Sequence, residues 1–117
     1  MPSLSTLFVL SILVLAGCAA QPNAAGRHLV YRDSSGVPTM QFDYPSAEFC
    51  QKVEAIASRG ARCEAHSADG ELHGRATLRY DPPGILVEGH YPDLGRCQSA
   101  NSKMAPGVEL VNPCSAK

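Results

Sequence analysis

The chain has 117 residues, with 10 Lys and Arg against 11 Asp and Glu and a formal net charge of −1 at pH 7. Its charges are scattered without a block of one sign, so charge alone predicts neither nucleic acid nor an anionic lipid surface as a partner. The length allows one small domain with a thin core, and such domains usually need disulfides or another constraint to be stable.

The first 17 residues have the pattern of a secretory signal. Residues 7–15 form an apolar run that contains one polar residue, Ser11, and the first charged side chain is Arg27. A helix that crosses a bilayer needs roughly 20 apolar residues, and the apolar stretch from Leu4 to Ala16 is shorter. We therefore interpret residues 1–17 as a signal peptide that is removed. Its start departs from the usual pattern, because no Lys or Arg precedes the apolar run.

The apolar run ends in Leu15-Ala16-Gly17-Cys18. Small residues directly before a cysteine resemble the lipobox of bacterial lipoproteins, and the resemblance covers residues 1–18 only. It implies that Cys18 carries three acyl chains, typically including palmitate, which anchor a protein to a membrane. Because Ala19 rather than Asp follows, it also implies sorting to the outer membrane, facing the periplasm. The alternative is a conventional cleavage site near residues 16–20 beside an unmodified cysteine.

The predicted domain spans residues 27–117 and follows a small, polar tether at residues 18–26. Its first elements are a strand at 28–32, a turn at 33–36 and a strand at 37–44, in which apolar and polar residues alternate. A helix at 47–58 follows, with Ser46 as its N-cap. A strand at 61–66 and a turn at 67–70 come next. The apolar face of the helix is formed by Phe49, Val53, Ile56 and Ala57.

The same order of signals returns in the second half of the domain. Segment 78–84 matches segment 30–36 at an offset of 48 residues, and segment 91–98 matches segment 44–51 at an offset of 47. A one-residue deletion in the second hairpin reconciles the two offsets. The elements expected here are a strand at 85–91, a helix at 94–104 capped by Asp93, and a strand at 108–111.

These elements predict an α+β fold, in which an antiparallel sheet carries two helices on one face. We interpret the sheet as two ββαβ repeats, at about residues 27–67 and 73–117. Since the chain has no Trp, the aromatic part of its core is expected to come from Tyr31, Phe42, Tyr44, Phe49, Tyr80 and Tyr91.

Four cysteines remain when Cys18 is assigned to lipid, and an even number in a small exported domain predicts two disulfides. Four cysteines allow three pairings. A strand that returns antiparallel to its helix brings Cys63 level with Cys50, so we predict the pair Cys50–Cys63 and, by analogy, Cys97–Cys114. The second pair needs a bend at residues 112–113, because Cys114 lies seven residues beyond Gly107.

Two other roles for these cysteines stay open. One is a zinc site shared with histidines, and the other is a redox-active pair. Neither has its usual motif, since the sequence contains no C-x-x-C and no H-x-x-x-H spacing. We therefore expect no metal and no cofactor. The histidines concerned are His28, His66, His73 and His90.

Candidate binding residues fall in two groups. The first is the exposed turn Asp81, Pro82, Pro83 and Gly84, because a turn stiffened by proline loses less entropy when it binds. The second is the polar face of the sheet, which is either simply solvated or a surface for a partner protein. This face is expected to carry Arg32, Gln41, Asp43, Arg62, Glu64, Arg75, Arg79, Glu88 and His90.

The candidate bases and nucleophiles do not lie within a catalytic motif. The sequence has neither a G-x-S-x-G elbow nor a carboxylate pair in a recognised pattern. We therefore expect a non-enzymatic lipoprotein that binds another component of the cell envelope or has a structural role there. The alternatives are an exported inhibitor or interaction module that uses its turns, and a small envelope enzyme. The enzyme would draw on His66, His73, His90, Ser67, Ser99 and Ser102.

Overall fold

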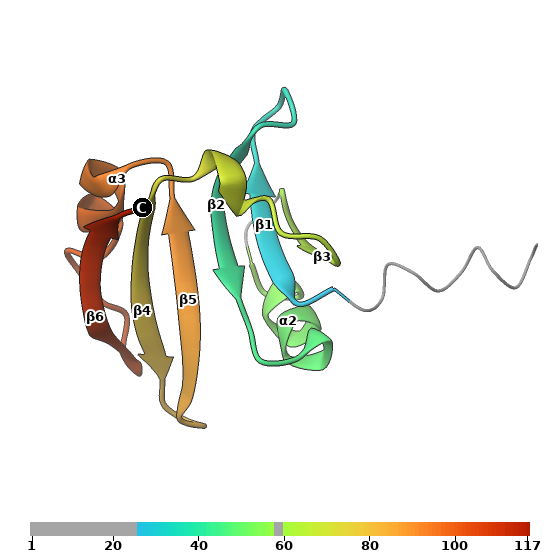
Figure 1. Cartoon of the computed structure of the whole chain (residues 1–117). Coiled ribbons are helices and arrows are strands. Elements are labelled where there is room, and N and C mark those ends of the chain that lie inside the picture. The colour runs from blue at the N-terminus through green and yellow to red at the C-terminus, as the bar shows by residue number, and fades with distance from the viewer. Residues whose placement is uncertain (1–25, 58–59) are drawn as a thin grey trace, which may run out of the picture.

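The computed structural model describes residues 26–57 and 60–117 (Figure 1). The predicted signal peptide, the lipobox and all of the tether except Gly26 lie outside these residues. In chain order the elements are β1 (His28–Arg32), β2 (Pro38–Asp43), α2 (Ala47–Glu54), β3 (Ala61–Glu64), the 3₁₀ turn η3 (Asp69–Glu71), β4 (Gly74–Tyr80), β5 (Ile85–Tyr91), α3 (Leu94–Ala100) and β6 (Val108–Ala116).

The strands form one six-stranded antiparallel sheet in the order β3-β1-β2-β5-β4-β6 (Figure 1). We call β1, β2, α2 and β3 the first half, and β4, β5, α3 and β6 the second half. The halves meet where β2 pairs with β5, with Phe42 opposite Gly89. The described part of the chain is therefore a mixed α/β fold with an antiparallel sheet and two helices, as the sequence predicts.

One face of the sheet carries the hydrophobic core. The strand register places Leu29, Phe42 and Ala76 on this face, and Phe42 packs against both buried clusters. Cys50 of α2 belongs to the first cluster and Cys97 of α3 to the second, so both helices pack on this face. The predicted aromatic core is confirmed, because these clusters contain Tyr31, Phe42, Tyr44, Phe49, Tyr80 and Tyr91.

Both helices begin where the sequence predicts, because a side chain caps each first turn. Ser46 Oγ accepts a hydrogen bond from the N–H of Phe49 at 3.1 Å. Asp93 Oδ1 accepts one from the N–H of Arg96 at 2.7 Å. Each bond satisfies a backbone donor that has no partner within the helix.

Both helices end earlier than predicted. α2 ends at Glu54 instead of residue 58, and Ile56, which helical spacing placed on the apolar face, is 85% exposed. That prediction for Ile56 is wrong, since the chain leaves the helical path before this residue. α3 ends at Ala100 instead of residue 104. The Asn101 side chain donates to the carbonyl of Cys97 at 2.9 Å, and such side-chain bonds compete with continuation of a helix.

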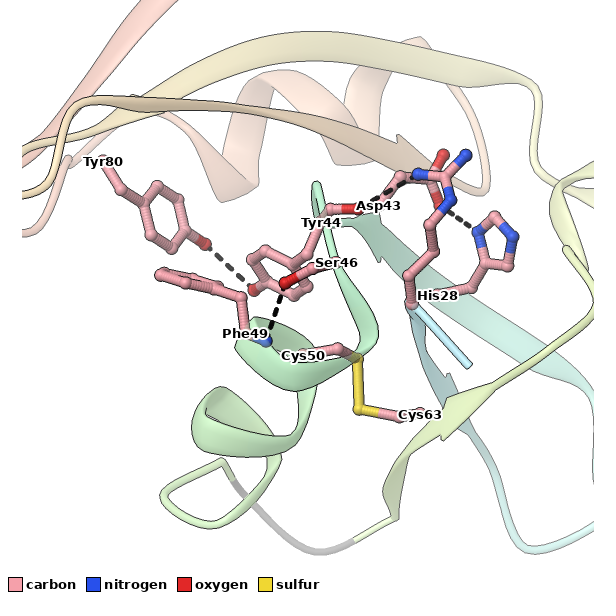
Figure 2. The surroundings of a disulfide bond; sticks show 9 residues. His28, Asp43, Tyr44, Ser46, Phe49, Cys50, Cys63 and Tyr80 are labelled. Carbon is pink, nitrogen blue, oxygen red and sulfur yellow. Dashed lines mark hydrogen bonds and ion pairs between the residues drawn. A yellow bond between two sulfur atoms is a disulfide. The ribbon is translucent and has the colours of Figure 1, made fainter. Parts of the chain in front are cut away.

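The disulfides Cys50–Cys63 and Cys97–Cys114 are both present, as predicted, with Cα atoms 6.1 and 5.9 Å apart. Figure 2 shows how Cys50 reaches from α2 to β3. β6 is longer than the predicted strand at 108–111, and its register against β4 shifts on both sides of Thr77. These irregularities take up the extra residues before Cys114 and bring it back under α3.

Residues 65–73, which we call the crossover segment, connect the edge strand β3 to β4. The segment crosses the face opposite the helices, because the N–H of Ala68 donates to Gln41 Oε1 at 2.7 Å and Gln41 points away from the core face that holds Phe42. In Figure 1 its η3 turn lies beside β2. Under this cover Val30 and Gln41 are both fully buried.

We predict that replacing both Cys50 and Cys63 by alanine lowers the free energy of unfolding by about 3 kcal/mol, because the cross-link restricts the unfolded chain. Urea denaturation of the two forms measures the difference. The matched control replaces Cys97 and Cys114, which close a loop of similar length, with sequence separations of 13 and 17. A loss below about 1 kcal/mol for both pairs would contradict the prediction.

We also predict that Gly74→Ala destabilises the fold by about 1–3 kcal/mol, through overpacking. A Cβ atom at Gly74 would lie 2.6 Å from the carbonyl oxygen of Asp93, the residue that caps α3. Gly70→Ala is the control, since its Cβ would meet nothing within 4 Å. The thermal unfolding midpoint of Gly74→Ala should be lower than that of Gly70→Ala. Equal midpoints would show that the close approach of Gly74 to Asp93 does not limit stability.

Candidate functional site

Asp43 on β2 lies between two histidines from the neighbouring strands, on the face opposite the helices. His28 Nδ1 on β1 is 2.7 Å from Asp43 Oδ1, and His90 Nε2 on β5 is 2.9 Å from Asp43 Oδ2. Figure 2 shows the His28 ring directed at this carboxylate. One carboxylate oxygen thus contacts His28 of the first half, and the other contacts His90 of the second half.

Gln41 connects the carboxylate to the crossover segment. Its Nε2 donates to Asp43 Oδ1 at 2.7 Å and to Ser67 Oγ at 2.9 Å, while its Oε1 accepts from the N–H of Ala68. Ser67 Oγ in turn donates to Asp69 Oδ1 at 2.8 Å. Gln41 is fully buried, and these bonds use both polar atoms of its amide. The amide therefore fixes the crossover segment to the sheet.

Lys117 hydrogen-bonds to the second ring nitrogen of His90. Its Nζ lies 2.9 Å from His90 Nδ1 and 3.3 Å from Asp69 Oδ2. A lysine ammonium can only donate, so Nδ1 accepts here and Nε2 carries the proton that is donated to Asp43. Since both ring nitrogens are engaged and the side chain is only 7% exposed, this histidine serves as a connector in the network.

The two acids of this network have lowered pKa values. Burial alone would raise the pKa of Asp43, but hydrogen bonds from His90, His28 and Gln41 outweigh it and hold that pKa well below its usual range. The hydrogen bond from Ser67 lowers the pKa of Asp69, and Lys117 adds to the effect against a smaller opposing contribution from burial. Both carboxylates are therefore ionised at neutral pH.

The polar sheet face differs from the predicted solvated face at two positions. Gln41 and His90 are buried, because the crossover segment and Lys117 cover them. Strand alternation predicts Asp43 on this face, but its contact with His28 and the link through His90 to Lys117 were not predicted. Strand alternation could have found His28, since it precedes the buried Val30 by two residues, whereas no local signal points to Lys117.

The other predicted binding residues lie apart from this network. Arg32 forms a bidentate pair with Glu64, at 2.8 and 3.0 Å, and Arg79 pairs with Glu109 at 3.3 Å. His66 and His73 are exposed. The structure does not bring these side chains into one site. The exposed turn Asp81, Pro82, Pro83 and Gly84 lies at the end of the sheet opposite η3 (Figure 1).

Over the second half, the same face is open. A groove of about 420 Å³ lies across β5, β4 and β6, and a neighbouring one of about 340 Å³ shares its Thr77 and Glu88. Glu88 accepts a hydrogen bond from Thr77 Oγ1 at 3.1 Å, and Asn112 Nδ2 donates to Thr77 at 3.2 Å. The groove of about 420 Å³ is lined by Arg75, Ala76, Thr77, Glu88, Asn112, Pro113 and Ser115.

Within residues 26–57 and 60–117, no three His, Cys, Asp or Glu side chains gather closely enough to hold a metal ion. Among the helices of this described part, neither has the length and apolar composition to cross a membrane. Comparisons of the chain with models of protein families, with curated proteins and with solved structures found no match.

Asp43→Asn is predicted to lower the free energy of unfolding by about 2 kcal/mol at pH 7, because bonds to a charged group typically contribute about 1.5–3 kcal/mol. The wild type should also lose stability below about pH 5, since the Asp43 pKa is lower in the folded than in the unfolded protein. This contribution begins to fall as the pH approaches the unfolded pKa, about 3.9, and disappears as the pH falls further toward the folded pKa.

Urea denaturation between pH 3 and pH 7 would measure both effects. The difference between wild type and Asp43→Asn should shrink as the pH falls. Asp81→Asn is the control, because Asp81 is exposed in the hairpin turn. A difference that stays constant over this range would show that the charge of Asp43 does not stabilise the fold.

Proposed function

We propose that this chain is a lipid-anchored, non-enzymatic binding protein of the bacterial cell envelope. The observation that carries the anchor is the sequence Leu15-Ala16-Gly17-Cys18 after an uncharged apolar run. Acylated at Cys18, the protein would stay at the membrane, with the domain held by a short tether. Ala19 favours the outer membrane, with the domain in the periplasm.

The binding role is supported by the open groove on the polar sheet face. Arg75 lines this groove, and the side chain forms no hydrogen bond or ion pair with any residue in 26–57 or 60–117. Elsewhere on the same face Arg32 and Arg79 have carboxylate partners. An unpaired cation beside a carboxylate, in a groove built on rigid strands, is suited to recognition of a polar partner.

We further propose that the two halves are ββαβ repeats. Matching glycines with positive φ support this: Gly36 and Gly84 in the hairpin turns, and Gly60 and Gly107 before the third strands. The register supports an offset of 47 throughout the paired strands, because Leu29 pairs with Phe42 as Ala76 pairs with Gly89. In this proposal the offset of 48 residues applies to the turn, and the offset of 47 applies to the paired strands, including residues 78–80.

A second candidate function is that of an inhibitor or interaction module that uses the turn at 81–84. This turn is exposed, and its ends are fixed by hydrogen bonds from the N–H of Asp81 to Gly107 O at 2.8 Å and from the N–H of Gly84 to Tyr80 O at 2.6 Å. Replacing Pro82 and Pro83 by alanine should then abolish capture of the partner, whereas Arg75→Gln should not.

For the anchor, we predict that Cys18→Ser moves the protein out of the membrane fraction of a double-membraned bacterium, because the thiol that accepts the lipid is lost. Cell fractionation with immunoblotting measures this, and mass spectrometry of the wild-type N-terminus should find an acylated Cys18. Ala19→Asp is the matched variant. It should keep the lipid and move the protein to the inner membrane, whereas membrane retention of Cys18→Ser would refute the anchor.

A further inference from the structure

The first half of the sheet shows how this polar face binds a chain segment, which here contains the 3₁₀ turn η3. The crossover segment lies on β1 and β2, where its Ser67 hydroxyl accepts a hydrogen bond from Gln41 and its Ala68 N–H donates one to the same amide. Val30 is fully buried beneath it. One glutamine side chain thus recognises both a backbone donor and a side chain of the bound segment.

Among the residues that the structure describes, no such segment lies over the equivalent positions in the second half. At the offset of 47 residues, Val30 corresponds to Thr77, Gln41 to Glu88 and His28 to Arg75. These three residues line the groove of about 420 Å³. Arg75 is exposed and Glu88 is half-buried, so their charged groups remain accessible.

The chemistry of the second half differs from that of the first in one respect. The Gln41 amide both donates and accepts, while the Glu88 carboxylate only accepts. A segment in the second groove must therefore present donors to Glu88, and a lysine or arginine is the donor with complementary charge. Arg75, by the same reasoning, calls for a carboxylate. Backbone N–H groups of the segment supply further donors, as Ala68 does in the first half.

We propose that a peptide segment of another protein binds across β5, β4 and β6 and hydrogen-bonds to Glu88 there, as the crossover segment hydrogen-bonds to Gln41 on the first half. A lysine or arginine of this segment pairs with Glu88, and an acidic side chain pairs with Arg75. The proposal rests on the binding role and the repeat proposed above, and it gives the partner's chemistry. The lipid anchor is independent of it.

The probe is a fluorescently labelled synthetic peptide with the sequence of residues 65–73 carrying Ser67→Lys, which keeps the acidic residues Asp69 and Glu71. It is titrated into the full-length protein in detergent, and fluorescence anisotropy reports binding. We expect saturable binding that Glu88→Gln and Arg75→Gln each weaken about tenfold, which corresponds to loss of one charged contact. The unsubstituted peptide should bind more weakly to the wild type.

Two controls lie on the same face but outside the groove. Glu109→Gln and Arg62→Gln change the same charges and should leave the affinity unchanged. The wild type should prefer the peptide with lysine at position 67. The Glu88→Gln variant should instead prefer the unsubstituted peptide, because a glutamine can bind Ser67 as Gln41 does. Circular dichroism checks that each variant is folded.

The proposal is overturned if the peptide does not bind, if both controls weaken binding as much as the groove variants, or if only replacement of Pro82 and Pro83 abolishes it. These outcomes leave the anchor untouched, since that is measured by acylation and fractionation. Conversely, an unacylated Cys18 would refute the anchor while groove binding could still be measured.

Discussion

The two halves of the sheet are joined by the short pairing of β2 with β5, which we call the seam. The Asp43 carboxylate stabilises the seam on the face opposite the helices. β2 and β5 pair at three positions only, Gln41 with His90, Phe42 with Gly89 and Asp43 with Glu88. Phe42 closes the seam on the helix side by packing into both hydrophobic clusters. Asp43 closes it on the other side, because one oxygen binds each half. The position of the open groove relative to the covered half depends on this seam.

Local signals predicted much of the fold. The caps Ser46 and Asp93 fixed both helix starts, and the strands at 28–32 and 85–91 have the expected bounds. Helix ends were missed because Asn101 and the turn after Glu54 act against an otherwise helical pattern. The burial of Gln41 and His90 was missed because it depends on the path of the crossover segment. Alternation assigns a residue to a face, but it does not say what lies over that face.

For the candidate site, the sequence likewise predicted the face on which each residue lies but not what covers that face. Alternation put Arg75, Glu88 and Asp43 on one face, and the structure places them there. It could not separate the covered half from the open half, since that distinction arises from one connection between β3 and β4. The pairing of Arg32 with Glu64 likewise became visible only when β1 and β3 were placed side by side.

Each disulfide closes within one half, and no disulfide among the described residues joins the halves. The halves are therefore joined by the pairing of β2 with β5, by the contacts around Asp43, and along the chain by the crossover segment. A pulling force applied between the two ends of the domain could not lengthen the loops between paired cysteines. It could extend β1, β2, β4 and β5, which lie outside those loops, so mechanically each disulfide protects one helix and its following strand but neither hairpin.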